Sequence, residues 1–351
     1  MSVTDSVFLK ACRREATDRI PVWFMRQAGR ALPEYRAARG PGSILDAIRR
    51  PELAAELTLQ PVARYGVDAA ILFSDIVVPV AALGFGVEIE QGVGPVVARP
   101  FRTADDLDRL RALDPENDTP YVLETVRLVT KALAADGVPL IGFAGAPFTV
   151  ASYLIEGGPS RDYTKTMALM KEDPALWARL LETLAEVALS SLRSQVAAGV
   201  SAVQLFDSWA GALSAAEYEK SVLPASRRVL GGLADLGVPR IHFGMGTGHL
   251  LPLMAAAGAD VVGVDWRTPL DQARTLIGPG FAVQGNLNPS TCLEGFGPVR
   301  DEARDVIARG GGTGHIFNLG HGVLPQTDPA VLEELVGYVH DQKPGQPGSG
   351  R

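Results

Sequence analysis

The sequence predicts an α/β fold, a single (β/α)8 barrel of the TIM type with extra helices. First, eight short apolar runs alternate along the chain with segments of helical spacing. Second, most of these runs are almost continuously apolar, which is typical of parallel strands covered on both faces. Third, the 351 residues and the 46% hydrophobic content suffice for one large core, and such barrels often exceed about 250 residues as one domain. We therefore expect one domain over residues 1–340.

The eight predicted strands share β-rich apolar character and a polar or glycine residue at the carboxyl end. In chain order they are Ile20–Met25, Val67–Phe73, Pro139–Phe143, Ala202–Phe206, Arg240–Phe243, Asp260–Val264, Phe281–Gln284 and Ile316–Leu319. The strands that begin near 240, 260 and 281 are about 20 residues apart, which is short for a strand, a full helix and a return. A doubly wound open sheet is therefore the alternative.

Helices are predicted between most of these strands. Pro51 places a proline in the first turn of one helix, and Gly66 ends it. Apolar residues recur at helical spacing in the other predicted helices, which span residues 119–135, 174–198, 215–235, 297–309 and 329–340.

Two further segments depart from the alternating pattern. Residues 87–99, VEIEQGVGPVVAR, alternate on either side of a glycine-rich turn, which predicts an inserted hairpin. Residues 341–351, DQKPGQPGSGR, are rich in proline, glycine and serine, so we expect a disordered C-terminal tail.

Charge and cysteine content exclude several classes of protein. The 33 basic and 40 acidic residues give a net charge of −7, which argues against a protein that binds nucleic acid or anionic membranes. Two cysteines, Cys12 and Cys292, cannot form a disulfide framework or a four-cysteine zinc site. The N-terminal region is charged throughout, and the apolar stretch Val67–Val87 is interrupted by Asp68 and Asp75. We therefore expect a cytoplasmic protein without a membrane segment.

Polar side chains follow the carboxyl ends of most predicted strands. In a barrel these ends meet at one mouth, where such enzymes place their active sites. The polar residues at these ends are Arg26, Gln27, Arg30, Ser74, Asp75, Thr149, Tyr153, Asp207, Ser208, Asp265, Asn286 and His321. Cationic, anionic and neutral hydrogen-bonding groups together predict a site for a charged small molecule.

Several of these candidates also have a structural explanation. Arg26 and Arg30 are four residues apart, so they could share a solvated helix face and pair with Glu34. They could equally bind several carboxylates, because each guanidinium can bind bidentately. Asp75 could cap a helix or form a buried ion pair, and Tyr153 could be a core tyrosine with a satisfied hydroxyl.

The remaining candidate residues and the absence of several known motifs limit the kinds of reaction that the site could catalyse. Ser208 could cap a helix, whereas His321 lies between two glycines, a setting that core packing does not explain. The sequence has no GxGxxG after a strand, no P-loop Gly-Lys, and no HExxH, GxSxG or CxxC motif. The glycine cluster at 244–248 could bind phosphate or form a tight turn. We therefore expect no metal and no cofactor.

Two long motifs resemble the signatures of the uroporphyrinogen decarboxylase family. Residues 20–35 read IPVWFMRQAGRALPEY, and residues 142–157 read GFAGAPFTVASYLIEG. Four shorter matches occur in the order found in that family, namely LFSD (72–75), FDS (206–208), GN (285–286) and GHGVLP (320–325). The resemblance spans residues 5–340, and the two long motifs together are highly specific.

This resemblance implies a fold and an activity. The family has a distorted (β/α)8 barrel, is usually a homodimer and works without cofactor or metal. It removes the four acetate carboxylates of uroporphyrinogen III and gives coproporphyrinogen III, in haem biosynthesis.

The same resemblance implies roles for residues of this chain. Asp75 would bind the central pyrrole N–H groups and stabilise a cationic ring, and Arg26 would bind the reacting acetate, with Tyr153 beside it. Arg26 is also a candidate proton donor, but arginine is a very weak acid, so a water molecule held by Arg26 is the alternative. The implied substrate-binding residues are Arg30, Gln27, Ser208 and His321. Asn288 stands where the family usually has aspartate, and we expect at most a structural effect, because a turn accepts either residue.

Two other functions remain open. A zinc- or cobalamin-linked methyltransferase of the same superfamily would bind zinc through a His-x-Cys motif and a later cysteine. The comparable stretch here is His242-Phe243-Gly244, and Cys292 alone cannot complete such a site. A non-catalytic tetrapyrrole carrier would need only arginines and an apolar wall, so the presence of Asp75, Tyr153 and His321 together disfavours it.

Overall fold

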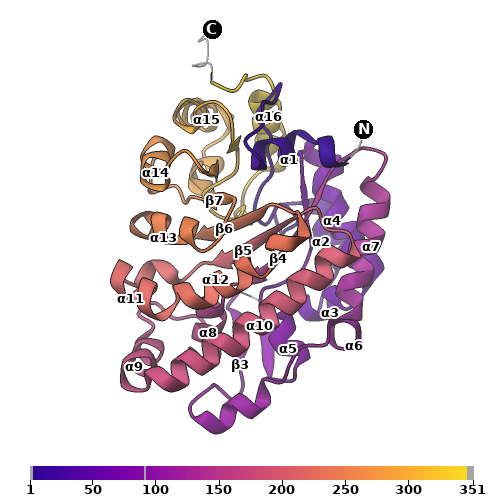
Figure 1. The fold of residues 1–351 in the computed structure, drawn as a ribbon. Helices are drawn as coiled ribbons and strands as arrows, with labels where there is room; N and C mark the ends of the chain where they lie inside the picture. The colour runs from indigo at the N-terminus through magenta and orange to yellow at the C-terminus, as the bar shows by residue number, and fades with distance from the viewer. Residues whose placement is uncertain (1–2, 91, 346–351) are drawn as a thin grey trace.

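The computed structural model describes residues 3–90 and 92–345, which form a curled parallel sheet surrounded by helices (Figure 1). Within these residues the sheet has seven strands in the order β1-β4-β5-β6-β7-β8-β9, each parallel to the next. The strands are β1 (Ala70–Ile71), β4 (Leu140–Gly145), β5 (Ala202–Asp207), β6 (Arg240–Gly244), β7 (Val261–Gly263), β8 (Ala282–Gln284) and β9 (His315–Ile316). They overlap with seven of the eight predicted runs.

The strand order contradicts the doubly wound alternative. Consecutive strands are neighbours from β4 to β9, whereas a doubly wound sheet reverses its strand order at a switch point. The short connections after β6 and β7 hold two short helices, α13 (Leu251–Ala256, 6 residues) and α14 (Leu270–Ile277, 8 residues). A short helix is therefore enough for these crossovers.

Side-chain hydrogen bonds across the interior show how strongly the sheet curls. Trp23 Nε1 donates to Gln284 Oε1 at 3.0 Å, and Gln284 Nε2 donates to Gln204 Oε1 at 3.0 Å. All three side chains are buried. Gln204 belongs to β5 and Gln284 to β8, and two strands separate them in the sheet. They can meet only because the sheet curves round a common interior.

The first predicted strand, Ile20–Met25, is not a strand of this sheet, but its backbone bonds to both edges. Val22 forms an isolated parallel bridge with Phe317, and the Trp23 N–H donates to the Phe317 carbonyl at 3.3 Å. On the other side, the Asp68 N–H donates to the Val22 carbonyl at 2.8 Å. The segment therefore lies between the end of β9 and the residues that precede β1.

Pro51 and Gly66 set the ends of one long helix as predicted. α4 (Pro51–Tyr65) begins with Pro51 and is capped by Gly66, whose φ of 67° is left-handed. The other long helices that match predicted ranges are α7 (Pro120–Leu133), α10 (Pro174–Ala198), α15 (Phe296–Gly310) and α16 (Pro329–His340). The remaining helical segments are η1 (Val3–Asp5), α1 (Val7–Cys12), α2 (Pro33–Arg39), α3 (Ile44–Ile48), α5 (Val78–Ala82), η2 (Ala104–Arg109), α6 (Pro115–Asp118), α8 (Pro147–Glu156), α9 (Thr164–Glu172), η3 (Ala210–Ala212), η4 (Ala234–Leu236), η5 (Gly248–Leu250) and η6 (Pro289–Leu293).

The predicted single helix over residues 215–235 is wrong, because the chain forms two helices there. α11 (Ala215–Ser221) ends before Val222, and α12 (Leu223–Gly231) has Pro224 in its first turn. Proline has no N–H to donate to the carbonyl four residues back, and its ring clashes with that carbonyl. A helix start, where the N–H has no partner, accepts it.

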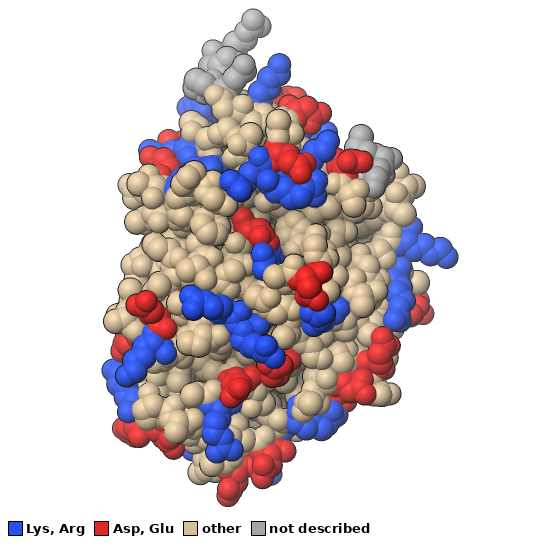
Figure 2. Space-filling model, viewed as in Figure 1, with Lys and Arg blue, Asp and Glu red and all other residues tan. Residues whose placement is uncertain are grey.

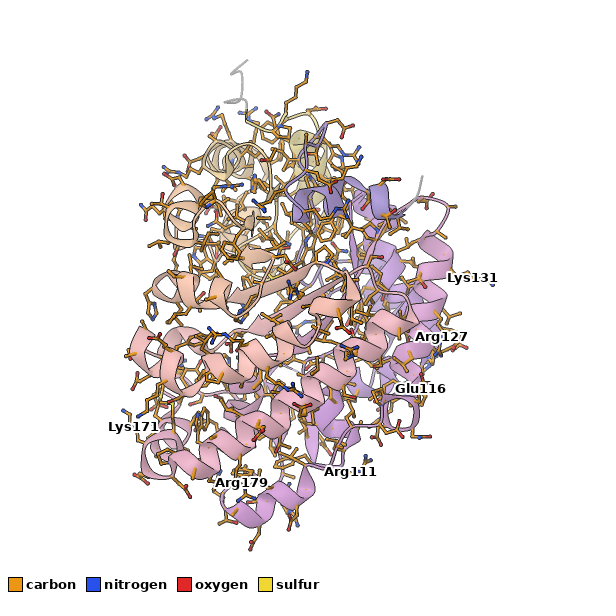
Figure 3. All side chains as sticks on the ribbon, viewed as in Figure 1. Arg111, Glu116, Arg127, Lys131, Lys171 and Arg179 are labelled. Carbon is orange, nitrogen blue, oxygen red and sulfur yellow. The ribbon has the colours of Figure 1, made fainter. Side chains whose placement is uncertain are left out.

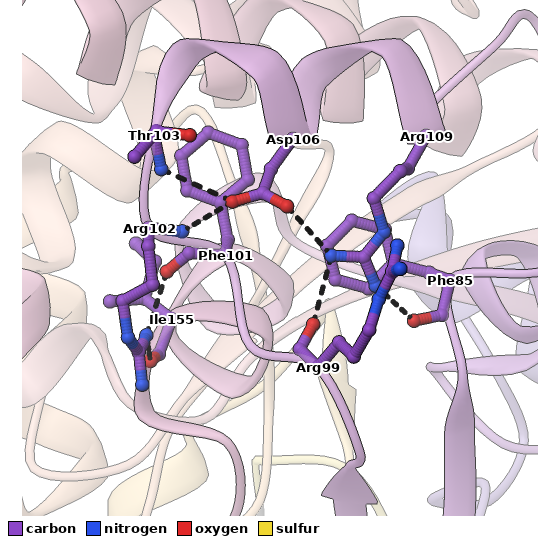
Figure 4. A network of polar contacts seen from close by, with 8 residues as sticks. All are labelled: Phe85, Arg99, Phe101, Arg102, Thr103, Asp106, Arg109 and Ile155. Atoms are coloured by element: carbon purple, nitrogen blue, oxygen red, sulfur yellow. Dashed lines mark hydrogen bonds and ion pairs between the residues drawn. The ribbon is translucent and has the colours of Figure 1, made fainter.

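The segment between α5 and α6 makes an excursion away from the main sheet and packs against α8, the helix that follows β4. β2 (Val87–Glu90) and β3 (Gly94–Val97) pair antiparallel and form a separate two-stranded sheet. The chain then folds over α8, where the Phe101 N–H donates to the Leu154 carbonyl at 2.8 Å. The Arg102 guanidinium donates to the Ile155 carbonyl (Figure 4). This excursion therefore fastens the carboxyl-terminal half of α8.

Charged side chains cover the outer helices. Figure 2 shows basic and acidic side chains interspersed over one face, and Figure 3 shows Arg127 and Lys131 of α7 and Lys171 of α9 pointing outward. No helix in the described part of the chain is long and apolar enough to cross a membrane. Of the predicted tail, residues 341–345 form turns and a bend after α16, and residues 346–351 lie outside the described residues.

Candidate active site

The chain turns sharply at Arg26, directly after the segment that joins the two edges. Its φ of 58° is left-handed, which costs a residue with a side chain on the order of 1 kcal/mol. The side chain of Gln27 holds this turn, because Oε1 accepts from the Phe24 N–H at 3.0 Å and Nε2 donates to the Ala69 carbonyl at 3.1 Å. Gln27 is 1% exposed. Its amide therefore supports the Arg26 backbone and faces the interior, not the mouth.

Arg26 lies against the loop that follows β9. A Cβ atom on Gly322 would lie 2.5 Å from Cδ of Arg26, so only glycine leaves room for this approach. The Val323 N–H also donates to the Met25 carbonyl at 2.9 Å. These contacts bring Arg26 beside His321, although the two residues lie at opposite ends of the chain.

His321 is a neutral hydrogen-bonding group at neutral pH. Burial, and after it the charges of Arg26 and Arg267, together lower the pKa of His321 to about 4. Its Nδ1 accepts a hydrogen bond from the Gly322 N–H, which leaves Nε2 as the protonated nitrogen of the neutral ring. His321 can therefore donate a hydrogen bond from Nε2 without carrying a charge.

Asp75 lies between β1 and α5, at the carboxyl end of the strand. Burial raises the pKa of the Asp75 carboxyl, while hydrogen bonds from the Val77 and Ile76 N–H groups and the nearby Arg26 charge oppose that rise. The Val77 N–H donates to Asp75 Oδ1 at 3.1 Å, so the carboxylate also forms the turn that starts α5. Donors placed on its other oxygen would favour the charged form.

Tyr153 reaches the same place from α8. Its ring stacks on Trp209, with ring centroids 3.9 Å apart and a tilt of 35°, and Tyr163 packs on Trp209 with centroids 4.9 Å apart. Burial and the Asp75 charge raise the pKa of Tyr153 to about 12, against the opposing effect of Arg26. Tyr153 is therefore a neutral hydroxyl within electrostatic reach of Asp75 and Arg26.

A buried carboxylate ties the aromatic pair to the sheet. Asp207, the last residue of β5, is fully buried, and its Oδ1 accepts from the Thr149 hydroxyl at 2.9 Å. The Thr149 Oγ1 in turn accepts from the Trp209 N–H at 3.3 Å. Asp207 thus links β5, α8 and the turn that carries Ser208, which is half-buried. The Asp207 carboxylate therefore helps to hold, through Thr149, the backbone that carries Trp209.

The structure brings four predicted site residues together and places others differently. The charge of Arg26 acts on the pKa of Asp75, of Tyr153 and of His321, and the charge of Asp75 acts on Tyr153. Arg30 is exposed, as Arg26 is, and its carbonyl accepts a short hydrogen bond from the Arg36 guanidinium. Two residues near the site were missed by sequence reasoning, Trp209 and Arg267. Each lies two residues after an aspartate at the carboxyl end of a strand. Position after a strand end is the signal that identified the other candidate residues.

His242, the candidate zinc ligand of the methyltransferase alternative, lies in the interior beside Asp207. His242 Nε2 lies 3.9 Å from Asp207 Oδ2, and both atoms are buried without a hydrogen-bond partner among the described residues. No group of three or more His, Cys, Asp or Glu side chains in the described part of the chain is placed to hold a metal ion.

The curled parallel sheet, with a carboxylate, an arginine, a tyrosine and a histidine gathered at its carboxyl end, defines an α/β enzyme of the TIM-barrel type. A model of the family described as "Uroporphyrinogen decarboxylase (URO-D)" matches residues 4–342. The chain belongs to this family.

Relatives and solved structures agree with this assignment. The chain is 60% identical to uroporphyrinogen decarboxylase of Streptomyces coelicolor, over 96% of this chain and 95% of that protein. It is 61% identical to the protein of that name from Salinispora tropica, over 96% and 90%. A methyltransferase from Methanosarcina mazei has a similar structure, with a TM-score of 0.78 and 21% identity over 97% of this chain and 98% of that one. The last comparison supports the fold alone.

Proposed function

We propose that this protein removes the four acetate carboxylates of uroporphyrinogen III and produces coproporphyrinogen III, without a cofactor. Membership of the family supports this proposal together with one observation. A half-buried carboxylate, Asp75, whose pKa burial raises, lies within electrostatic reach of Arg26 and of the neutral hydroxyl of Tyr153. The reaction needs these three kinds of group in one place.

Decarboxylation of a pyrrole acetate needs an electron sink. Direct loss of CO2 would leave a carbanion beside an electron-rich ring. Protonation of a ring α-carbon makes the ring cationic, and the electrons of the breaking C–C bond then flow into the ring as CO2 leaves. The resulting exocyclic methylene takes a proton to become a methyl group, and the α-carbon returns its proton. Each round therefore consumes one proton overall and releases one CO2.

Asp75 is assigned to the stabilisation of that cation. Pyrrole N–H groups that donate to its carboxylate would favour the charged form and offset the effect of burial. A carboxylate held in place before the reaction lowers the free energy of a developing positive charge, because no solvent has to reorganise. The turn at Val77 and the Arg26 charge hold the carboxylate there.

Arg26 is assigned to the reacting acetate and Tyr153 to the space beside it. The substrate carries eight carboxylates, and a protein of net charge −7 needs local positive charge to bind it. Arg26 is a poor proton donor, because the guanidinium is a very weak acid, so a water molecule held by it is the alternative donor. Arg30, Ser208 and His321 are assigned to substrate binding, whereas Gln27 is assigned to holding the Arg26 turn.

We also propose the finer architecture and the assembly. The segment Pro21–Trp23 takes the place of the eighth strand and closes a (β/α)8 barrel, which its hydrogen bonds to Phe317 and Asp68 support. Residues 1–340 act as one domain. A homodimer and a cytoplasmic location follow from the family resemblance. Sedimentation equilibrium of the purified protein tests the dimer.

Anaerobic incubation with chemically reduced uroporphyrinogen III, with a chelator and no added cofactor, tests the activity. The products are oxidised and separated by their number of carboxylates. We expect seven-, six-, five- and four-carboxylate porphyrins to appear in turn. An unchanged eight-carboxylate peak with tight binding of the same compound would indicate a carrier. Stoichiometric tightly bound zinc with no turnover would indicate a methyltransferase.

A further inference from the structure

We propose that Arg267 is a further substrate-binding arginine, which binds a propionate carboxylate of the tetrapyrrole at the rim of the mouth. This inference rests on the proposed function, because it concerns the same substrate. Propionates are kept in all four rounds of the reaction, and each is one methylene longer than an acetate. Arg267 follows β7, a different strand end from those that carry Asp75 and Arg26, the residues assigned to the pyrrole ring and the reacting acetate. A propionate, which no round of the reaction removes, is therefore the carboxylate that suits Arg267.

Arg267 belongs to a turn that is fastened to the neighbouring strand ends. It lies in the loop after β7, and the Asp265 carboxylate there accepts from the Gly246 N–H after β6 at 2.7 Å. On the other side, Asn286 Nδ2, after β8, donates to the carbonyls of Asp265 and Thr268 at 2.8 and 2.7 Å. The backbone that carries Arg267 is thus held from the ends of the two strands that flank β7.

The same turn contacts the loop that carries His321. A Cβ atom on Gly320 would collide with the Trp266 backbone nitrogen, so the two loops pack directly together. The charge of Arg267 acts on His321, as does the charge of Arg26. The loop that carries His321 is therefore in contact with Arg26 at Gly322 and with the Arg267 turn at Gly320, so two arginines from different strand ends flank it.

The guanidinium of Arg267 is held in a fixed plane with part of it open to solvent. Its Cζ lies 4.0 Å from the centroid of the Trp266 ring, and one Nη donates to Asp265 Oδ2 at 2.6 Å. The Arg267 side chain is nevertheless 52% exposed. A guanidinium has five N–H donors, so the contact with Asp265 leaves donors for a carboxylate. Stacking on an aromatic ring reduces the freedom that binding would otherwise remove.

A purely structural role for Arg267 would be to neutralise Asp265. That role does not account for the exposed part of the guanidinium. Asp265 also accepts from two backbone N–H groups, those of Gly246 and Arg267 itself, at 2.7 and 3.2 Å. Hydrogen bonds of this kind stabilise a buried carboxylate without a counter-ion. The side chain is therefore available for substrate.

The test compares Arg267→Ala with Arg267→Lys in two measurements. In the anaerobic turnover assay, Arg267→Ala should raise the KM for uroporphyrinogen III about tenfold, the effect of one lost charge-assisted hydrogen bond, with kcat changed less than threefold. In anaerobic equilibrium dialysis, the Kd for coproporphyrinogen III should rise by the same factor, because this product keeps its propionates. Arg267→Lys should recover part of the loss in KM and in Kd, since lysine keeps the positive charge but cannot form two parallel hydrogen bonds to one carboxylate.

Arg304→Ala is the matched control. Arg304 lies on α15, is 50% exposed and pairs with Asp301 at 3.2 Å, so its loss changes the net charge equally, away from the mouth. An unchanged Kd for coproporphyrinogen III in Arg267→Ala, or an equal rise in Arg304→Ala, would overturn the proposal. The dialysis does not need turnover, so an inactive parent protein would reject the proposed function and still decide the role of Arg267.

Discussion

Arg26 shows how one residue takes an unfavourable backbone conformation that remote residues support. Its left-handed φ of 58° is held by the Gln27 amide, which bonds to Phe24 and Ala69, and the space for its side chain comes from Gly322. The strain of Arg26 is of the kind found at functional sites, where the surrounding structure over-determines a conformation.

Asp75→Asn tests the charge of the carboxylate with little change in size. We expect kcat for uroporphyrinogen III to fall by about 10²-fold or more, the magnitude that a lost electrostatic group gives in other enzyme sites. The oxygen of the introduced amide can still accept from the Val77 N–H, so the melting temperature should stay close to that of the parent. Activity within a few-fold of the parent would contradict the assigned role of Asp75.

His321 makes stability depend on pH. The pKa of His321 is about 4 in the folded protein, against 6.5 for an ordinary histidine. Between these values the unfolded chain binds a proton that the folded protein does not, so the free energy of unfolding decreases as pH falls from about 6.5 toward 4. His321→Asn should lose part of this decrease, measured by urea unfolding at pH 7 and pH 5.

A second histidine provides the comparison for this measurement. Burial also lowers the pKa of His315 to about 4, and His315 lies outside the mouth, with Nε2 bonded to the Gly285 carbonyl at 3.0 Å. His321→Asn should therefore keep the His315 contribution. An identical pH dependence in the parent and in His321→Asn would contradict the assignment.

At the scale of elements, the segment after the hairpin contacts α8 through Phe101 and Arg102. Arg109 holds this segment together. Its guanidinium donates to the Phe85 and Arg99 carbonyls at 2.7 and 2.9 Å and to Asp106 at 2.9 Å, and it lies 3.8 Å from the Phe85 ring centroid (Figure 4). Arg109→Ala should lower the free energy of unfolding by about 2 kcal/mol, because it removes three hydrogen bonds, two of them part-buried, and the contact with the Phe85 ring. Chemical denaturation measures this change.

The matched control for Arg109 is Arg127→Ala. Arg127 is 50% exposed and pairs with Glu116 at 3.6 Å, so its loss should change the free energy of unfolding by less than about 0.5 kcal/mol. Equal effects of the two substitutions would contradict the role assigned to Arg109 in holding this segment together.

At the scale of the whole molecule, Asp68 joins three distant parts of the chain. Its Oδ2 accepts from the Val22 N–H and from His340 Nε2, each at 2.8 Å, and its Oδ1 accepts from Arg19 at 2.5 Å. Asp68→Ala should lower the free energy of unfolding by about 3 kcal/mol, because the bonds between the first segment, the start of β1 and α16 lose their acceptor. Asp301→Ala, at a carboxylate that is 57% exposed, should change it by less than about 0.5 kcal/mol.

Local sequence determined most of the elements and the centre of the candidate site. Seven of the eight predicted runs contain strands, because a continuous apolar run suits a strand that is covered on both faces. Helix ends follow from proline and glycine, whose backbone preferences act within one turn, and Pro224 would have shown the break at Val222. Asp75 and Tyr153 could be predicted because each follows a strand end.

Tertiary structure alone decided the remaining features. The segment around Val22 joins two edges, the Gln27 amide faces inward, and Arg267 lies beside His321. Each of these facts depends on contacts between residues far apart in the chain, and a local pattern carries no information about such partners. The sequence by itself thus determined the motifs and the order of the elements. The tertiary structure decided where a polar side chain points, because its hydrogen-bond partners come from distant parts of the chain.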